Sequence, residues 1–196
     1  VNNGWTTRAV GGAWPLGEEC GLTKGFGAVW SDKGDLEDAT PRGLQVTEQA
    51  LEALAGDTPR FVWVHYLEPH APYFEGYPAE LIRSGSGDEA LYNSEIAFVD
   101  GQIGRLMDVV SDDTLVVLTA DHGEGFKNHV NIGHVGLDGD VLHVPLLFCG
   151  KGIRSRSIDT PVSLLDVAPT LLAFAGIEAP DSFLGQSLYK SVVDGT

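Results

Sequence analysis

Apolar residues recur along the chain with two different periods, which alternate from one segment to the next. Three short runs are continuous, apolar and rich in β-branched residues, as is typical of strands buried on both faces. These predicted strands cover residues 61–67, 114–120 and 145–149. Residues 1–38 are rich in Gly and Trp and show little periodicity, which indicates loops with short strands.

A first helix is predicted to begin at Thr40, which suits the N-cap, with Pro41 at the first helical position. Gly56 is placed to end this helix. Its apolar stripe consists of Leu44, Leu51 and Leu54.

A second, longer helix is indicated by apolar residues at alternating steps of four and three: Tyr92, Ile96, Val99, Ile103, Leu106 and Val110. A third helix is predicted after Ser163 and Asp166, which resemble a capping box, and it runs through Ala175 to a stop at Gly176. Pro169 should either kink this helix or set its true start.

Strands that alternate with helices predict an α/β fold, with a mainly parallel sheet flanked by helices. The chain has 196 residues, and a chain of roughly this size buries about 70% of the surface that its unfolded form exposes. No linker or shift in composition indicates a domain boundary, so residues 1–196 are expected to form a single domain.

The composition is strongly acidic. The 28 Asp and Glu residues outnumber the 12 Lys and Arg residues, so the formal net charge is −16. This charge argues against electrostatic binding to bare nucleic acid or an anionic membrane, and no apolar run approaches the ~20 residues that span a bilayer. We therefore expect no nucleic-acid or membrane partner. The surface is halophilic-like, and an anionic substrate would need local positive charge from a metal ion or placed side chains.

The two cysteines say little about function. Cys20 and Cys149 are far apart and form no CxxC pair, so we interpret both as small buried apolar residues. These features do not fix the compartment, and a cytoplasmic location is only the default expectation.

Candidate chemistry follows the two strongest strand predictions. Asp121 and His122 come directly after residues 114–120, and His70 lies three residues past residues 61–67. Ligands bind beyond the carboxyl ends of strands in open α/β sheets. If both strands are central and parallel, these side chains converge at one edge of the sheet.

Asp121 and His122 supply a carboxylate and an imidazole, which together can ligate one divalent cation where the chain turns at Gly123. The alternative, an Asp that caps the next helix beside a surface His, is favoured by the dipeptide alone. The segment 121–140 is polar, Gly-rich and long for a plain connection, which makes it a candidate functional loop.

Prolines on both sides of His70 stiffen the loop around it. The imidazole could donate a proton or a hydrogen bond to an anionic group, or it could pack beside Tyr73 for structural reasons. Among the other histidines, His134 is a candidate to face a substrate, His129 is interpreted as a solvated or supporting residue, and His65 as a core residue.

Together and in this order, five segments resemble the sulfatase family of the alkaline phosphatase superfamily. HYLEPHAPY at 65–73 is similar to the family's strand and PHxPY segment, and TLVVLTADHGEGF at 114–126 matches its metal-binding TADHGE motif. These two are the most specific. The other similar segments are YNSEIAFVDGQIGRLMD, GHVGLDGDVLHVPLLFCGKGI, and PVSLLDVAPTLLAFAGIEAP with FLGQSL.

The resemblance implies an alkaline-phosphatase-like fold in which Asp121 and His122 bind one divalent metal ion. Oxygen-only sites suit Ca²⁺, whereas an imidazole ligand favours Mn²⁺ or Zn²⁺. His70 would contact the sulfate or phosphate group and the leaving-group oxygen. His134 stands where many sulfatases have a Lys that holds the anionic group, so His70 and His134 are the implied catalytic and substrate-binding residues. His143 stands where the family often has an Arg.

One departure from the family is large. Sulfatases carry an N-terminal acidic pair and a CxPSR-type motif whose Cys or Ser becomes the formylglycine nucleophile, and neither Cys20 nor Cys149 has that context. The resemblance therefore implies a partial catalytic domain, with its N-terminal strands and nucleophile segment missing. Its partner would be the missing N-terminal part of the same protein, and this chain alone is expected to be inactive.

The implied function is metal-dependent hydrolysis of a small-molecule or glycan sulfate ester. Two alternatives stay open. The substrate could be a phosphate mono- or diester or a phosphonate, or the reaction a phosphoglycerol-type transfer, within the same superfamily. The domain could also be degenerate and bind a partner without catalysis.

Overall fold

The computed structural model describes residues 4–12, 21–32, 41–56, 58–78, 81, 85–126 and 136–195. The chain divides into two compact units, Val1–Val110 and Ser111–Thr196. None of the helices in these described ranges combines the length and the apolar character that crossing a membrane requires.

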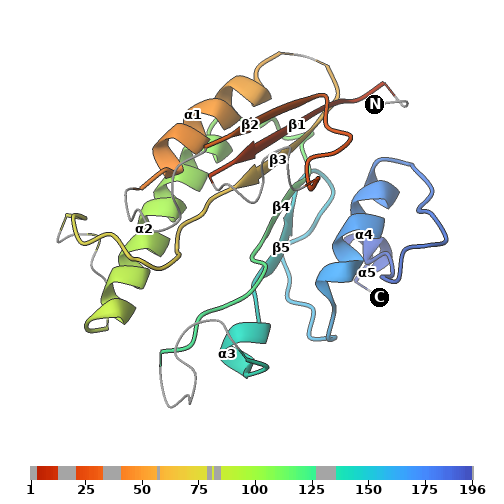
Figure 1. The fold of residues 1–196 in the computed structure, drawn as a ribbon. Coiled ribbons are helices and arrows are strands. Elements are labelled where there is room, and N and C mark those ends of the chain that lie inside the picture. The colour runs from red at the N-terminus through yellow and green to blue at the C-terminus, as the bar shows by residue number, and fades with distance from the viewer. Residues whose placement is uncertain are drawn as a thin grey trace. The chain divides into compact units, whose positions relative to one another are not determined.

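Unit 1 contains a three-stranded parallel sheet in the order β2-β1-β3 (Figure 1). The strands are β1 at Thr6–Gly11, β2 at Ala28–Ser31 and β3 at Arg60–His65. This sheet agrees with the predicted parallel α/β architecture, and the short strands expected in residues 1–38 are β1 and β2. The strand predicted at 61–67 begins one residue earlier and ends two residues earlier.

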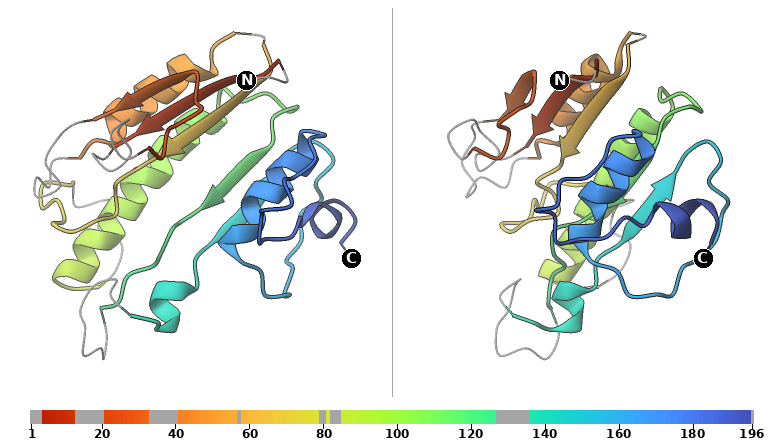
Figure 2. Two further views of the ribbon diagram at one scale, coloured as in Figure 1. Left: turned by 45° about the vertical axis from the view of Figure 1, so that its right-hand side comes forward. Right: turned by 90° about the vertical axis from the view of Figure 1, so that its right-hand side faces the viewer.

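Helix α1, Gly43–Leu54, lies along one face of this sheet (Figure 2). Its buried residues are Gly43, Val46, Thr47, Ala50 and Ala53. Val46 and Ala53 pack with Val10 of β1 in the core. The predicted leucine stripe was wrong at Leu44, which is 50% exposed, whereas Leu51 and Leu54 are half-buried. The small side chains beside it on the helix face the sheet instead, which lets the two backbones approach closely.

The start of α1 also differs from the prediction. Arg42 is the N-cap, Pro41 precedes it, and Thr40 lies outside the described residues. The N–H groups of Arg42 and Gly43 instead donate to Oε1 of Glu68, at 2.5 and 3.0 Å. The Glu68 carboxylate, from the loop after β3, therefore caps the N-terminus of α1.

Helix α2, Asp88–Met107, packs beside α1. Its buried residues are polar: Ser94, Glu95 and Gln102. The predicted apolar stripe does not describe this buried face, and Ile96 is 43% exposed. Ser94 is satisfied within the helix, because its hydroxyl donates to the Ala90 carbonyl oxygen at 2.8 Å.

Unit 2 contains an antiparallel strand pair, β4 at Val116–Thr119 and β5 at Leu146–Cys149. Both strands were predicted, but their antiparallel pairing departs from the expected parallel sheet. The chain reverses between them, so that the end of β4 lies opposite the start of β5 and the Thr119 hydroxyl donates to the Pro145 carbonyl oxygen at 2.8 Å. The expectation of a buried Cys149 was wrong, because this cysteine is exposed.

The helices of unit 2 are α3 at Gly139–Leu142, η4 at Leu164–Asp166, α4 at Val167–Phe174 and α5 at Tyr189–Val193. The capping box is confirmed: the Ser163 hydroxyl accepts from the Leu165 N–H at 3.2 Å, and Asp166 Oδ2 accepts from the Ser163 N–H at 2.8 Å. Pro169 lies in the first turn of α4, where a missing N–H is tolerated, so it marks the start of this helix.

We predict that Gly43→Ala destabilises the chain. An added Cβ would lie 2.7 Å from Cε1 of Phe98 on α2, so the Phe98 ring or the helix that carries it would have to shift. Overpacking of this kind lowers the free energy of unfolding by about 1–3 kcal/mol.

The matched control is Gly104→Ala on α2, where nothing lies within 4 Å of an added Cβ. Alanine should stabilise that helix position by about 0.5–1 kcal/mol. Urea denaturation should shift the two midpoints in opposite directions, and equal midpoints would contradict the close packing of the two helices.

Candidate active site

The end of β3 sets the beginning of the loop that carries His70. His65 pairs with Gly11 at the last position of the β1–β3 register, and the Gly12 N–H donates to the His65 carbonyl oxygen at 3.0 Å. The ring of His65 contacts the ring of Trp63, with 6.3 Å between their centroids. The segment after this strand end, residues 68–74, is called the His70 loop here.

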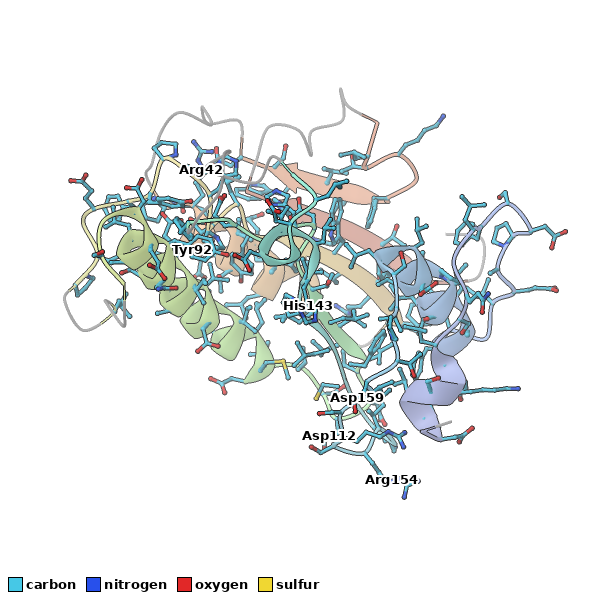
Figure 3. The ribbon with its side chains drawn as sticks, turned by 90° about the horizontal axis from the view of Figure 1, so that it is seen from below. Arg42, Tyr92, Asp112, His143, Arg154 and Asp159 are labelled. Carbon is cyan, nitrogen blue, oxygen red and sulfur yellow. The ribbon has the colours of Figure 1, made fainter. Side chains whose placement is uncertain are left out.

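Glu68 ties the first residue of the His70 loop to α1. Its side chain is buried, with the residue 9% exposed, and Oε1 accepts the two N–H groups at the start of the helix. Negative charge is stabilising there, because the helix dipole places positive charge at its N-terminus. The buried Arg42 beside it forms an ion pair with Asp32, at 3.4 Å from Nε to Oδ2, and Figure 3 labels Arg42.

Glu95 of α2 holds the rest of the His70 loop. This residue is 2% exposed. Its Oε2 accepts the N–H of His70 at 3.1 Å, and its Oε1 accepts the N–H of Phe74 at 2.9 Å. One carboxylate thus binds two main-chain groups four residues apart. The contact uses the backbone of His70 and not its imidazole.

Burial raises the pKa of Glu95 to about 7. The two loop N–H groups lower this pKa, and the neighbouring Glu68 carboxylate raises it, but loss of hydration is the largest effect. Burial also raises the pKa of Tyr77, and the charges of Glu95 and Glu68 add to that rise. Burial therefore disfavours the charged forms of both Glu95 and Tyr77.

Aromatic rings also connect the His70 loop and the residues after it to α2. The Tyr73 ring packs edge-on against Tyr92 of α2 at 5.9 Å between centroids, and Phe74 packs edge-on against Tyr77 at 5.1 Å. Tyr77 also contacts Phe98 of α2 at 5.3 Å. The rings thus join the loop to α2, the helix that carries Glu95. Figure 3 shows where Tyr92 lies on this helix.

In unit 2, Asp121 and His122 follow the end of β4 after one intervening residue, Ala120. Asp121 Oδ1 accepts the His122 N–H at 3.0 Å, and Asp121 Oδ2 lies 3.8 Å from Nε2 of His122. The Asp121 side chain is 82% exposed. The carboxylate and the imidazole are thus adjacent, and the carboxylate is open to solvent.

The His122 ring has a defined tautomer. Its Nδ1 lies 2.9 Å from the carbonyl oxygen of Gly123, and because a carbonyl only accepts, Nδ1 carries the hydrogen. In the neutral ring, Nε2 is then the acceptor nitrogen, on the side of the Asp121 carboxylate.

This donor set, one carboxylate and one imidazole nitrogen, fits a divalent cation such as Ca²⁺, Mn²⁺ or Zn²⁺. Over the ranges that the structure describes, no group of three or more His, Cys, Asp or Glu side chains is placed to hold a metal ion. By themselves, Asp121 and His122 could fill only part of the coordination that such an ion takes.

Gly123 lets the chain turn against α3. Its N–H donates to the Val141 carbonyl oxygen at 2.8 Å, and an added Cβ would overlap the carbonyl oxygen of Asp140. This close approach of two backbones requires a glycine. The structure thus gives the reason for the turn that the sequence placed at this residue.

The remaining candidates divide between described and undescribed segments. His134 and His129 lie outside the described residues. His143 is exposed at the end of α3, where its N–H donates to the Gly139 carbonyl oxygen at 2.9 Å (Figure 3). His70 belongs to unit 1 and the Asp121–His122 pair to unit 2, so their predicted convergence stays a prediction.

Comparison with known proteins places these motifs in a family. The family model described as Sulfatase matches residues 37–177, which is well over half of the chain and includes both the His70 loop and the Asp121–His122 turn. The chain belongs to the sulfatase family. At the level of the family, it is therefore grouped with sulfuric ester hydrolases.

Two curated relatives show the extent of the similarity. The chain is 30% identical to the uncharacterized sulfatase YidJ of Escherichia coli (strain K12) over 187 residues, covering 75% of this chain and 37% of that protein. It is 31% identical to arylsulfatase K of Xenopus laevis over 132 residues, covering 64% of this chain and 25% of that protein. The chain therefore spans well under half the length of either sulfatase.

A solved structure supports the fold. The phosphonate monoester hydrolase SpPMH from Silicibacter pomeroyi matches with a TM-score of 0.76, over 98% of this chain and 60% of that chain. The sequence identity is 19%, so this likeness concerns the fold alone. It confirms the predicted α/β, alkaline-phosphatase-like architecture of this sulfatase-family chain.

Sequence reasoning singled out both loops as candidates but missed the carboxylates that hold the first. Glu68 stands beside Pro69 in the motif itself and was passed over. Glu95 lies three residues after Tyr92 and four before Val99, which places it on the face of the predicted apolar stripe. A charged residue at that position was the available signal, because Glu is seldom fully buried without a specific partner.

We predict that Gly123→Ala destabilises the turn after β4. The new methyl group would force the Asp140 carbonyl oxygen away and break the hydrogen bond from the residue 123 N–H to the Val141 carbonyl oxygen. The free energy of unfolding should fall by about 1–3 kcal/mol. Gly139→Ala on α3 is the control, since nothing lies within 4 Å of an added Cβ there. Thermal denaturation should separate the two variants, and equal melting temperatures would contradict the close approach at Gly123.

We also predict that Glu95 makes stability depend on pH. Its pKa is about 7 in the folded chain against an ordinary value of 4.5, so its stabilising contribution is complete below pH 4.5 and is lost as the pH rises through 7. The free energy of unfolding relative to Glu95→Gln should fall by on the order of 3 kcal/mol across that window.

Asp100→Asn, an exposed change on the same helix, is the control and should show no such trend. Urea denaturation at a series of pH values makes the comparison. A difference between the native chain and Glu95→Gln that is constant with pH would rule out a raised pKa.

Proposed function

We propose that this chain provides the metal-binding and proton-donating parts of a sulfate ester hydrolase. The observation that carries this proposal is the turn after β4. There the Asp121 carboxylate lies beside an imidazole whose tautomer is set by the Gly123 carbonyl oxygen, with Nε2 left as an acceptor. Membership of the sulfatase family supports the choice of reaction.

Asp121 and His122 would hold the divalent ion. The sulfatase family generally uses such an ion, usually Ca²⁺. When bound, it supplies Lewis-acid stabilisation of the charge on the transferred group. The imidazole nitrogen at His122 also suits Mn²⁺ or Zn²⁺, so the proposal covers all three ions.

His70 would protonate the leaving-group oxygen as a general acid. A proton donor must be held within hydrogen-bond reach of the atom it serves, and the backbone of His70 is fixed by Glu95. His134 is proposed to bind the anionic group as an imidazolium, which limits that role to pH values below its pKa.

The proposed substrate is the sulfate ester of a small molecule or glycan. With a net charge of −16, the chain does not attract an anion through its overall field, so the metal ion and protonated histidines would supply the local positive charge. The nucleophile is proposed to come from another segment of the same protein, because no CxPSR motif occurs in these 196 residues.

Asp121→Ala tests the proposal in the full-length protein. With an aryl sulfate as substrate, kcat/KM should fall by about 100-fold or more, because the metal ion loses a charged ligand. Asp159→Ala is the matched control: this exposed aspartate lies well apart from His143 and the end of α3 (Figure 3). Removal of metal with EDTA should abolish activity, and adding Ca²⁺, Mn²⁺ or Zn²⁺ should restore it.

Unchanged turnover by Asp121→Ala would reject the metal role. The same full-length protein should also be assayed with a phosphate monoester and a phosphonate monoester. If either of these esters is hydrolysed faster than the aryl sulfate, that ester class and not the sulfate ester is the substrate. If no ester is hydrolysed, a degenerate binding domain is favoured.

A further inference from the structure

We propose that Glu95 is a positioning residue that sets the place of His70 for catalysis. This inference rests on the proposed function, since it assigns a purpose to Glu95 only if His70 acts on the substrate. It starts from the two hydrogen bonds of a 2% exposed carboxylate, to the N–H groups of His70 and Phe74 at 3.1 and 2.9 Å.

Both oxygens of the Glu95 carboxylate bind the loop, and we call this two-point attachment the clamp. The two oxygens of a carboxylate are rigidly joined, so their bonds to residues 70 and 74 fix both ends of the intervening turn relative to α2. Glu68 fixes the first residue of the same loop to α1 through Arg42 and Gly43. The main chain at His70 is therefore tied to both helices of unit 1, and a displacement of about 1 Å at a catalytic group can reduce the rate by about 100-fold.

Stability alone does not explain a carboxylate at this position. The burial that raises its pKa disfavours the charged form, and an apolar side chain is commonly as stable as or more stable than a buried charge. Phe74, whose N–H Glu95 binds, belongs to a cluster of rings with Tyr77 and Phe98 that offers apolar surface to such a side chain. What an apolar residue would not do is hold the N–H groups of His70 and Phe74 in fixed directions.

The test uses Glu95→Gln in the full-length protein, assayed at pH 8, above the pKa of Glu95, with aryl sulfates. The amide keeps one acceptor oxygen but turns an NH₂ group toward the second loop N–H, so the clamp is reduced to one point. We expect kcat to fall by about 10- to 100-fold while KM changes by less than about twofold. The exposed Asp100→Asn on α2 is the control and should keep the activity of the native protein.

Two readouts separate positioning from a merely structural role. The fold decrease in kcat caused by Glu95→Gln should grow as the leaving-group alcohol becomes more basic, because a basic leaving group depends most on protonation by a general acid. In a His70→Ala background, Glu95→Gln should change kcat by less than about twofold, since its effect acts through His70. Faster hydrogen exchange in a peptide covering residues 70–76, without a change in residues 43–54, should accompany the loss.

The outcomes distinguish the two proposals. If His70→Ala is as active as the native protein, the role proposed for His70 fails. If His70→Ala is impaired but Glu95→Gln has native kcat, or lowers kcat equally with and without His70, the positioning role is overturned while the proposed function stands. If Glu95→Gln does not fold, Glu95→Asp goes through the same cycle, because its shorter side chain reaches one loop N–H at most.

Discussion

The buried carboxylate of Glu95 is the contact on which the order of the His70 loop depends. It accepts the main-chain N–H groups of His70 and Phe74 from a position that is 2% exposed. Burial raises its pKa to about 7, so these hydrogen bonds form against the cost of removing a charge from water. A turn held in this way has few alternative conformations, which suits a segment that must present one imidazole.

The turn after β4 in unit 2 is ordered by a different constraint. Gly123 brings its backbone against α3, and its carbonyl oxygen fixes which nitrogen of His122 carries the hydrogen. A close backbone contact and a main-chain carbonyl group thus order the turn that carries the proposed metal ligands. In both units the chemistry-bearing side chain lies on a loop, and the main chain of that loop is bound by a neighbouring element.

The sequence was informative where the signal is local. Hydrophobic runs found β3, β4 and β5, and the Ser163–Asp166 capping box found the start of the last long helix. It failed where tertiary contacts determine the structure, because local patterns do not show what packs against an element. Three features depend on such packing: the buried face of α1, the antiparallel pairing of β4 and the burial of Glu95. Periodicity selects apolar positions, so a buried carboxylate on a helix is the kind of residue that it overlooks.

The most direct test of this account is an NMR titration of the Glu95 side-chain carboxyl carbon, together with the amide protons of His70 and Phe74. All three signals should titrate together with a midpoint near pH 7, because one carboxylate binds both amides and has a raised pKa. A carboxyl midpoint near the ordinary value of 4.5, or loop amides that do not follow it, would contradict the account.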